Sequence, residues 1–289
     1  MRWQLQVEEG RAVILSLLVI AVGLFLLCVV LAVVAWIDFE IRGERIVAER
    51  REAASRWRPP FVRGGDLFSW AKETAERMVG IRLVEEQKTG SLVKLAAEIQ
   101  EGATRAMLPL AAEADIERQV PCPEEGQGMV GVTVPEVIEI ADYIRRTATR
   151  AERKRIHDLA VDNARKITDL DHTQISEAET PCPLKGDDRV CRTYSARPLR
   201  CRPLHAAVIA RQFGLQAGTG ADPTSPWASH EKTVEQGAEQ GLTQGLQAAG
   251  LDANVYELNS ALVIALDTPD AAQRSMRGEN VFGACKLYR

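Results

Sequence analysis

The sequence predicts a mainly α-helical protein, in which one N-terminal transmembrane helix is followed by an irregular, cysteine-containing helical domain. Three observations predict this fold class. A run of 26 residues from Ala12 to Ile37 carries no charge. Aromatic residues make up only 5% of a chain rich in Leu, Val, Ile and Ala, which favours helix over sheet. Four prolines and three cysteines interrupt the helical pattern between Thr180 and Leu204.

The uncharged run is long enough to cross a bilayer. As a helix it would extend roughly 39 Å at about 1.5 Å per residue, whereas the hydrocarbon core is about 30 Å thick. A cleaved signal peptide is the alternative, with Val33–Ala35 as its cleavage site, but its apolar stretch would be only about 7–15 residues long. We therefore expect a short tail of residues 1–11 and an anchor of residues 12–37 in the lipid bilayer.

The basic residues on either side of the anchor predict its orientation. Two arginines precede it and six follow it: Arg2 and Arg11, then Arg42, Arg45, Arg50, Arg51, Arg56 and Arg58. Because positive charge is retained on the cytoplasmic side, we expect a single-pass protein whose soluble part is cytoplasmic. The cytoplasm keeps thiols reduced, which favours metal-bound or redox-active cysteines over structural disulfides.

Start and stop signals predict the helices of the soluble part. We divide it into a juxtamembrane helical region, residues 38–115, and a cysteine-cluster domain, residues 116–289. Helical pattern covers residues 66–116 with a break at Lys88–Ser91. Three further helices are expected: one opened by the capping box Thr133-x-x-Glu136 and running past Arg150, one at Ser229–Ala248 that ends at Gly250, and one capped by Asn254.

The cysteines outside the anchor do not form a disulfide pattern. Five remain there, and an odd number at irregular spacing is a poor disulfide framework. Cys182, Cys191 and Cys201 are separated by eight and nine residues, unlike the close pairs of zinc knuckles. From Cys182 to His205 the formal charge is 6 − 2 = +4, although the whole chain carries −4. Positive neighbours favour the thiolate, which binds metals; an exposed basic loop with incidental cysteines is the alternative.

The order of residues in this segment matches a known pattern. Its elements are Cys182-Pro183-Leu184, Cys191, Tyr194, Arg197-Pro198 and Cys201-Arg202. In this order they resemble the YkgJ-type cysteine-cluster family, the CxxCxxCC zinc- or iron-chelating domains, and the resemblance extends from Ile116 to Cys285. The family's first group holds several closely spaced cysteines, of which this sequence has only Cys122.

The resemblance implies a metal site and its surroundings. Four thiolates are enough for one zinc ion or one iron–sulfur cluster, and the implied ligands are Cys122, Cys182, Cys191 and Cys201. Three side chains are expected to hydrogen-bond the loop around the thiols rather than to catalyse a reaction: Tyr194, Arg197 and Arg202. His205 is a candidate substitute ligand, but a locally bonded histidine is the preferred interpretation.

Three functions are consistent with these residues. The first is a membrane-anchored metal-binding protein. The second is a metal-free, membrane-bound interaction module, because most of the first cysteine group is missing. The third is a redox or methyl-transfer enzyme, since family members include proteins similar to flagellin lysine-N-methylases, but this rests on analogy alone. No catalytic residue or protein partner is predicted, and the acidic net charge argues against a nucleic-acid partner.

Overall fold

The computed structural model describes residues 65–89, 92–107, 122, 130–171, 174–175, 178, 180–203 and 226–288. Helices make up 67% of these residues, which confirms the prediction of a mainly α-helical protein. The predicted transmembrane run, Ala12–Ile37, lies outside the described ranges. Within those ranges, no helix is long and apolar enough to cross a membrane.

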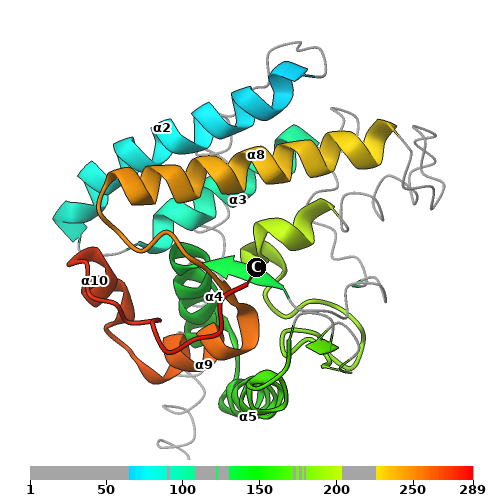
Figure 1. The fold of residues 1–289 in the computed structure, drawn as a ribbon. Helices are drawn as coiled ribbons and strands as arrows, with labels where there is room; N and C mark the ends of the chain where they lie inside the picture. The colour runs from blue at the N-terminus through cyan, green and yellow to red at the C-terminus, as the bar shows by residue number, and fades with distance from the viewer. Residues whose placement is uncertain are drawn as a thin grey trace, which may run out of the picture. The chain divides into compact units, whose positions relative to one another are not determined.

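Seven α-helices and a pair of short strands build the described part of the chain (Figure 1). The helices are α2 (Gly65–Thr89), α3 (Val93–Met107), α4 (Val134–Thr147), α5 (Arg150–Ile167), α8 (Pro226–Ala248), α9 (Leu258–Asp267) and α10 (Ala271–Met276). The strands β1 (Gly131–Thr133) and β2 (Val255–Glu257) are antiparallel, with Val132 opposite Tyr256. The short 3₁₀ turns η3 (Tyr194–Ala196) and η4 (Leu199–Cys201) lie in the cysteine segment.

Helix α4 lies at the centre of the core, in contact with α3 and α9. Its predicted apolar stripe is buried, and Val137 and Ile140 are fully inaccessible to solvent. The Thr133 amide and hydroxyl each donate to Glu136 Oε2 at 2.8 Å. The predicted start of this helix is therefore confirmed.

The end of α4 differs from the prediction. The helix ends at Thr147 instead of running past Arg150. A second capping pair explains the break: the Thr149 amide donates to Glu152 Oε2 at 3.0 Å, and the Glu152 amide donates to Thr149 Oγ1 at 3.2 Å. An N-cap residue has an extended backbone, and from that conformation its side chain can accept hydrogen bonds from the first amides of the next helix. Thr149 takes this role for α5, so the chain leaves the helical conformation before Arg150.

The start of α9 is also corrected. The prediction that Asn254 caps this helix is wrong, because Val255–Glu257 forms β2 and pairs with β1. The N-cap is Glu257, whose carboxylate accepts hydrogen bonds at 2.9 Å from the amides of Asn259 and Ser260. A β-branched residue and an aromatic residue at the start of this segment suit a strand.

The C-terminus of α8 lies where the sequence predicts it. Gly250 has a φ of +71°, a left-handed conformation that costs glycine little. Its amide donates to the carbonyl of Gln247 at 3.0 Å, and the Leu251 amide donates to the carbonyl of Leu246 at 2.9 Å. These two bonds form a Schellman motif, so the predicted glycine stop signal is confirmed.

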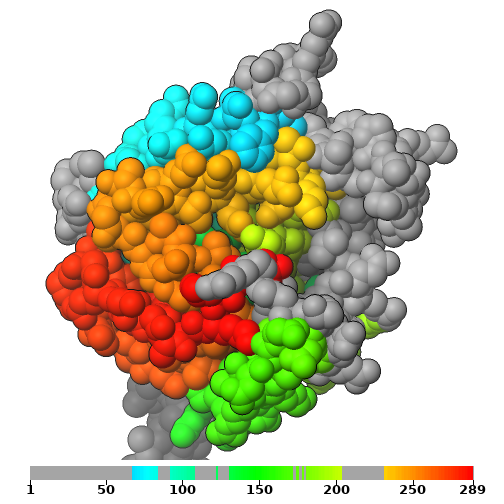
Figure 2. All heavy atoms as spheres, in the orientation of Figure 1, coloured from blue at the N-terminus to red at the C-terminus, as the bar shows by residue number. Residues whose placement is uncertain are grey.

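Helices α2 and α8 pack side by side and run in the same direction (Figure 1). The contact uses small residues at every fourth position of α8: Gly237 faces Phe68 and Ala71, Gly241 faces Lys72 and Ala75, and Gly245 faces Val79. In the space-filling view the cyan surface of α2 adjoins the yellow-to-orange surface of α8 (Figure 2). The described helices of residues 38–115 thus pack on helices of the later region, within one compact unit.

Replacing Gly241 should separate these helices. A Cβ there would collide with the carbonyl oxygen of Lys72, which is backbone and cannot rotate away. We expect Gly241→Ala to lower the free energy of unfolding by about 2 kcal/mol, because overpacking outweighs the gain in helix propensity. Urea unfolding of the full chain measures it.

The matched control is Gly80→Ala on α2, where a Cβ would meet nothing within 4 Å. This exposed substitution should raise the free energy of unfolding by about 0.5–1 kcal/mol. Equal effects of the two substitutions would contradict the close packing of α2 and α8.

Candidate functional site

A tight hairpin connects Cys182 with Cys191. Lys185 pairs with Cys191 across an antiparallel bridge, and the amide of Arg189 donates to the carbonyl of Gly186 at 2.9 Å. Arg189 has a φ of +65°, the left-handed conformation typical of the third residue in a three-residue hairpin loop. The eight residues between the two cysteines therefore form a turn that returns the chain toward its starting point.

Cys122 lies at the same hairpin, although it is distant in sequence. Its amide donates to the carbonyl of Arg189 at 2.8 Å. The left-handed residue of the turn thus provides the acceptor that holds the backbone of Cys122. The thiol of Cys122 is only partly buried.

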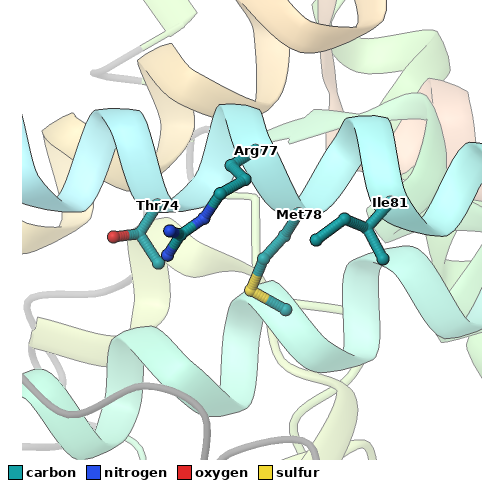
Figure 3. Close-up of a pocket in the computed structure, with 4 residues that line it drawn as sticks. All are labelled: Thr74, Arg77, Met78 and Ile81. Atoms are coloured by element: carbon teal, nitrogen blue, oxygen red, sulfur yellow. The ribbon is translucent and has the colours of Figure 1, made fainter.

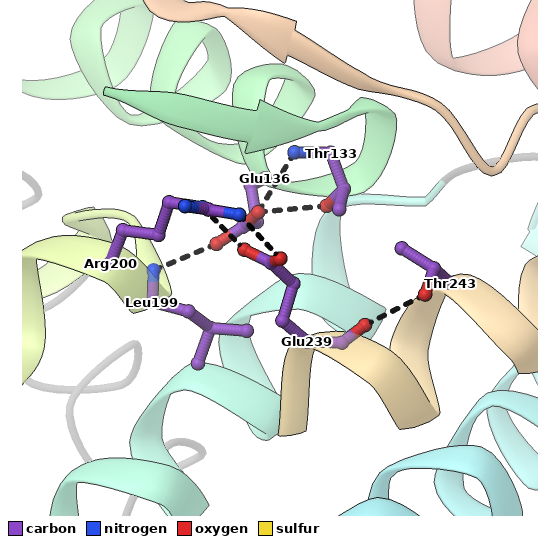
Figure 4. Close-up of polar contacts among 6 residues, drawn as sticks. All are labelled: Thr133, Glu136, Leu199, Arg200, Glu239 and Thr243. Carbon is purple, nitrogen blue, oxygen red and sulfur yellow. Dashed lines mark hydrogen bonds and ion pairs between the residues drawn. The ribbon is translucent and has the colours of Figure 1, made fainter. Parts of the chain in front are cut away.

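The residues around Cys201 are fixed to two separate helices. The Leu199 amide donates to Glu136 Oε1 of α4 at 2.8 Å. Arg200 makes a two-pronged pair with Glu239 of α8, with N–O distances of 2.6 and 2.7 Å. Figure 4 shows that the same Glu136 carboxylate bridges this turn and the start of α4, beside the Arg200–Glu239 pair. Both contacts immobilise the backbone that carries Cys201.

Arg202, one of the three predicted loop-binding side chains, attaches the cysteine segment to α3. It is only 1% exposed. Its guanidinium donates to the Ser195 carbonyl at 3.2 Å and to the Arg197 carbonyl at 3.1 Å. On α3 it donates to Gln100 Oε1 at 3.1 Å and to the hydroxyl of Thr104. Arg202 therefore joins two parts of the loop to a helix.

The other two predicted residues, Tyr194 and Arg197, contact each other. Arg197 Nη1 donates to the Tyr194 carbonyl at 2.6 Å, and the guanidinium carbon lies 4.1 Å from the centroid of the Tyr194 ring. Arg197 is 3% exposed. Its Nε has no hydrogen-bond partner among the described residues.

The four predicted ligands act on one another electrostatically. Burial, followed by the charge of Cys191, raises the pKa of Cys182 to about 12. Burial raises the pKa of Cys201 well above its usual value, and Cys182, Cys191 and Cys122 raise it further. The pKa of Cys122 is raised by burial and by Cys191, whereas the charge of Lys185 lowers it. Backbone contacts of the hairpin bring Cys122, Cys182 and Cys191 together, and the charges of all three act on Cys201.

The thiols are near one another but do not have ligand geometry. Among the described residues, no group of three or more Cys, His, Asp or Glu side chains is arranged to hold a metal ion. Cys285 lies in another environment, where burial raises its pKa to about 11 although the Ser260 side chain lowers it. His157 bonds to Asp267 at 3.0 Å, and His205 lies outside the described ranges.

Helix α8 carries two acids beyond Glu239 on the same face. Glu231 and Glu235 are each 6% exposed and form no hydrogen bond or ion pair within the described ranges. Burial raises the pKa of each carboxyl to about 7. Glu235 is also raised by the charge of Glu239 and lowered by that of Arg200. The face of α8 toward the cysteine segment is therefore rich in carboxyl groups, with Arg200 among them.

A pocket on α2 is a weaker candidate for a functional site. Its lining includes Thr74, Arg77, Met78 and Ile81 (Figure 3), all from one helix. These side chains bring together no set of chemically reactive groups. The cysteine segment is the stronger candidate because residues from distant parts of the chain converge on it.

Sequence reasoning missed the two acids that position Cys201. Glu136 was recognisable only as part of a capping box, whereas its second oxygen binds Leu199. Glu239 carried no sequence signal beyond its place on a helix. Comparisons of the chain with protein-family models, with characterised proteins and with solved structures found no match.

Stability should fall as the pH rises from about 4.5 to about 7. The folded-state pKa of Glu235 is about 7 and the ordinary value is 4.5, so between these values the folded state binds more protons than the unfolded state. The free energy of unfolding then decreases with rising pH, and the loss is complete above about pH 7. Glu235→Gln should flatten this decrease and stabilise the chain at pH 8 by about 1–2 kcal/mol, after allowance for solvent screening.

Urea unfolding between pH 4.5 and 8.5 measures this effect. Glu76→Gln, at an exposed position of α2, is the matched control and should leave the pH profile unchanged. Identical profiles for the wild type and Glu235→Gln would show that the carboxyl of Glu235 ionises without cost in the folded protein.

Proposed function

We propose that the chain is a membrane-anchored metal-binding protein, whose ligands for zinc or an iron–sulfur cluster are Cys122, Cys182, Cys191 and Cys201. One observation carries the proposal: the hairpin brings the distant Cys122 to the segment of Cys182 and Cys191, and burial, followed by the charge of neighbouring thiols, raises the pKa of Cys122, Cys182 and Cys201. Crowded thiols are costly to ionise together, and a bound cation removes that cost by offsetting their charge. Loading would deprotonate the thiols and require them to adopt a ligand arrangement that the described side chains do not have.

The surroundings of the thiols fit such a centre. Four thiolates are the donor set that soft metals prefer, and a centre with four thiolates is negatively charged. The charge of Lys185 lowers the pKa of Cys122, and the charge of Arg197 lowers the pKa of Cys201. Both effects favour the thiolate form. The unpartnered Nε of Arg197 is a buried donor that an anionic centre could satisfy.

The metal defines the chemistry. Zinc with four protein ligands has no open position and would stabilise the fold, whereas an iron–sulfur cluster would carry electrons. With either metal, Glu136 and Arg202 fix the backbone segment that bears Cys201. The motif that ends in Cys201-Arg202 supports membership of the YkgJ-type cysteine-cluster family.

The membrane part of the proposal rests on the sequence. The uncharged run Ala12–Ile37 is long enough to span a bilayer, and six arginines follow it against two before it. We infer that residues 12–37 anchor the chain to lipid and that the cysteine segment is cytoplasmic. Reducing conditions there keep thiols available to metal.

A second candidate function is a metal-free interaction module. The fold anchors the cysteine segment through Glu136, Glu239 and Gln100, none of which is a cysteine. Within the described ranges, no three ligand-type side chains are arranged to hold an ion. These observations favour a segment that keeps its structure with its thiols protonated.

Metal content tests the two candidates. The full chain, purified in detergent without oxygen and reconstituted, should contain about one zinc ion or one cluster's equivalent of iron and acid-labile sulfide per chain. Loss of a side chain that only hydrogen-bonds a ligand lowers metal affinity by about 10–100-fold. Cys201→Ser removes a ligand itself and should lower metal affinity by more than this. Cobalt substitution, followed by its thiolate charge-transfer absorption, measures affinity directly.

Cys285→Ser is the matched control, because it removes a buried thiol outside the group of four and should leave affinity unchanged. Substoichiometric metal in the reconstituted wild type would reject the metal site. In that case an unaltered fold in a Cys182→Ser, Cys191→Ser, Cys201→Ser variant would support the metal-free module.

Protease protection tests the anchor and its orientation. In intact cells, protease added outside should leave the region from residue 65 onward uncleaved, and permeabilisation should expose it. Deletion of residues 2–37 should release the chain from the membrane fraction into the soluble fraction. Cleavage of that region in intact cells would reverse the proposed orientation.

A further inference from the structure

Positive charge is concentrated where α4 ends and α5 begins. Six basic residues and one acid lie between Arg145 and Arg155, so this run carries a formal charge of 6 − 1 = +5. The whole chain carries −4, which leaves −4 − 5 = −9 for the rest of it. The run therefore creates a local positive field on a protein that is otherwise acidic.

Four of these side chains are exposed and form what we call the basic surface: Arg146, Arg150, Arg153 and Lys154. The last three are spaced i, i+3 and i+4 along α5 and are therefore neighbours on one side of that helix. Arg145 is different, because it donates to the Ala265 carbonyl of α9 and so belongs to the fold. Helix α5 lies at the edge of the described helices, with its main contact on α9 (Figure 1).

Two members of the basic surface pair with acids one helical turn away. Arg146 lies 2.7 Å from an oxygen of Asp142. Lys154 lies 2.5 Å from an oxygen of Asp158, and these two side chains are 75% and 53% exposed. Exposed ion pairs of this kind contribute little to stability. Both cations therefore remain available to an anion outside the protein.

The other two members have no such partner. Arg150 and Arg153 form no ion pair among the described residues, and they lie in the first turn of α5. Positive charge is unfavourable there, because the start of a helix is the positive end of its dipole. The one acid of the run, Glu152, accepts from the Thr149 amide at 3.0 Å and from its hydroxyl at 2.9 Å. The fold itself therefore gains nothing from the charges of Arg150 and Arg153.

The predicted anchor places one kind of anion within reach of this surface. Residues 38–64 lie between the anchor and α2 and can extend over at most about 95 Å, so the domain stays close to the bilayer. Such tethering lets weak contacts form. The cytoplasmic leaflet carries anionic headgroups that attract clusters of Lys and Arg. We propose that the basic surface docks on anionic lipid headgroups of the bilayer that anchors the chain. This inference rests on the anchor and orientation in the proposed function and does not involve a metal.

Chemical protection of Lys154 tests the docking. The full chain is placed in lipid nanodiscs of phosphatidylcholine, with or without phosphatidylserine, and the acetylation rate of each lysine is followed by mass spectrometry. Phosphatidylserine should lower the rate at Lys154 several-fold. Salt at about 1 M should restore the rate, because it screens charges beyond about 3 Å. Lys232, which is exposed on α8, is the internal control and should react equally in both discs.

Substitutions at neighbouring positions assign the protection to the basic surface. Each Lys or Arg near an anionic surface strengthens binding about fivefold. The double variant Arg150→Gln, Arg153→Gln should therefore weaken docking about 25-fold, and Lys154 should then react equally in both discs. Arg165→Gln is the matched control, because Arg165 is an exposed arginine in the last turn of α5, 3.7 Å from Asp162. This variant should keep the protection of Lys154.

Three results would overturn the docking on lipid. The first is an equal acetylation rate of wild-type Lys154 in discs with and without phosphatidylserine. The second is protection that persists in the Arg150→Gln, Arg153→Gln variant, which would locate the contact elsewhere. The third is protection by RNA in phosphatidylcholine discs without protection by phosphatidylserine, which would assign the surface to nucleic acid. Failure of the wild type to insert into discs is a separate outcome, because it would reject the anchor and the docking with it.

Discussion

The buried carboxylate of Glu136 is the interaction on which the rest of the structure depends. One oxygen accepts from Thr133 and starts α4, while the other accepts from the Leu199 amide and fixes the turn before Cys201. A single fully buried side chain thus links the central helix to the candidate site (Figure 4). Three hydrogen bonds compensate for removing the carboxyl from water, although burial still raises its pKa.

The cysteine segment is held from several directions because it has little regular structure of its own. Arg200 reaches α8 and Arg202 reaches α3, so neither the turn nor its thiol depends on local backbone hydrogen bonds alone. Helix α8 in turn is held close to α2 by glycines that leave no room for side chains, as at Gly241. The position of the site therefore depends on packing between helices that are far apart in the sequence.

Local signals were sufficient wherever the partners lie within a few residues of each other. The capping box at Glu136 and the stop at Gly250 were both predictable, because hydrogen bonds at helix ends join near neighbours along the chain. The same reasoning failed at Arg150 and Asn254. There, a competing local cap at Thr149 and a strand pairing with a distant segment decided the backbone instead.

The sequence by itself determined the helical class, the start of α4, the end of α8 and the cysteines that are proposed as ligands. Only the tertiary structure decided that Cys122 meets the hairpin at Arg189 and that Arg200 pairs with Glu239. These contacts join residues tens of positions apart, and no periodicity or spacing encodes such a pair. The Arg200–Glu239 pair forms because α8 packs against the turn η4, which brings the two charged side chains together, and polar groups taken from water then pair with each other.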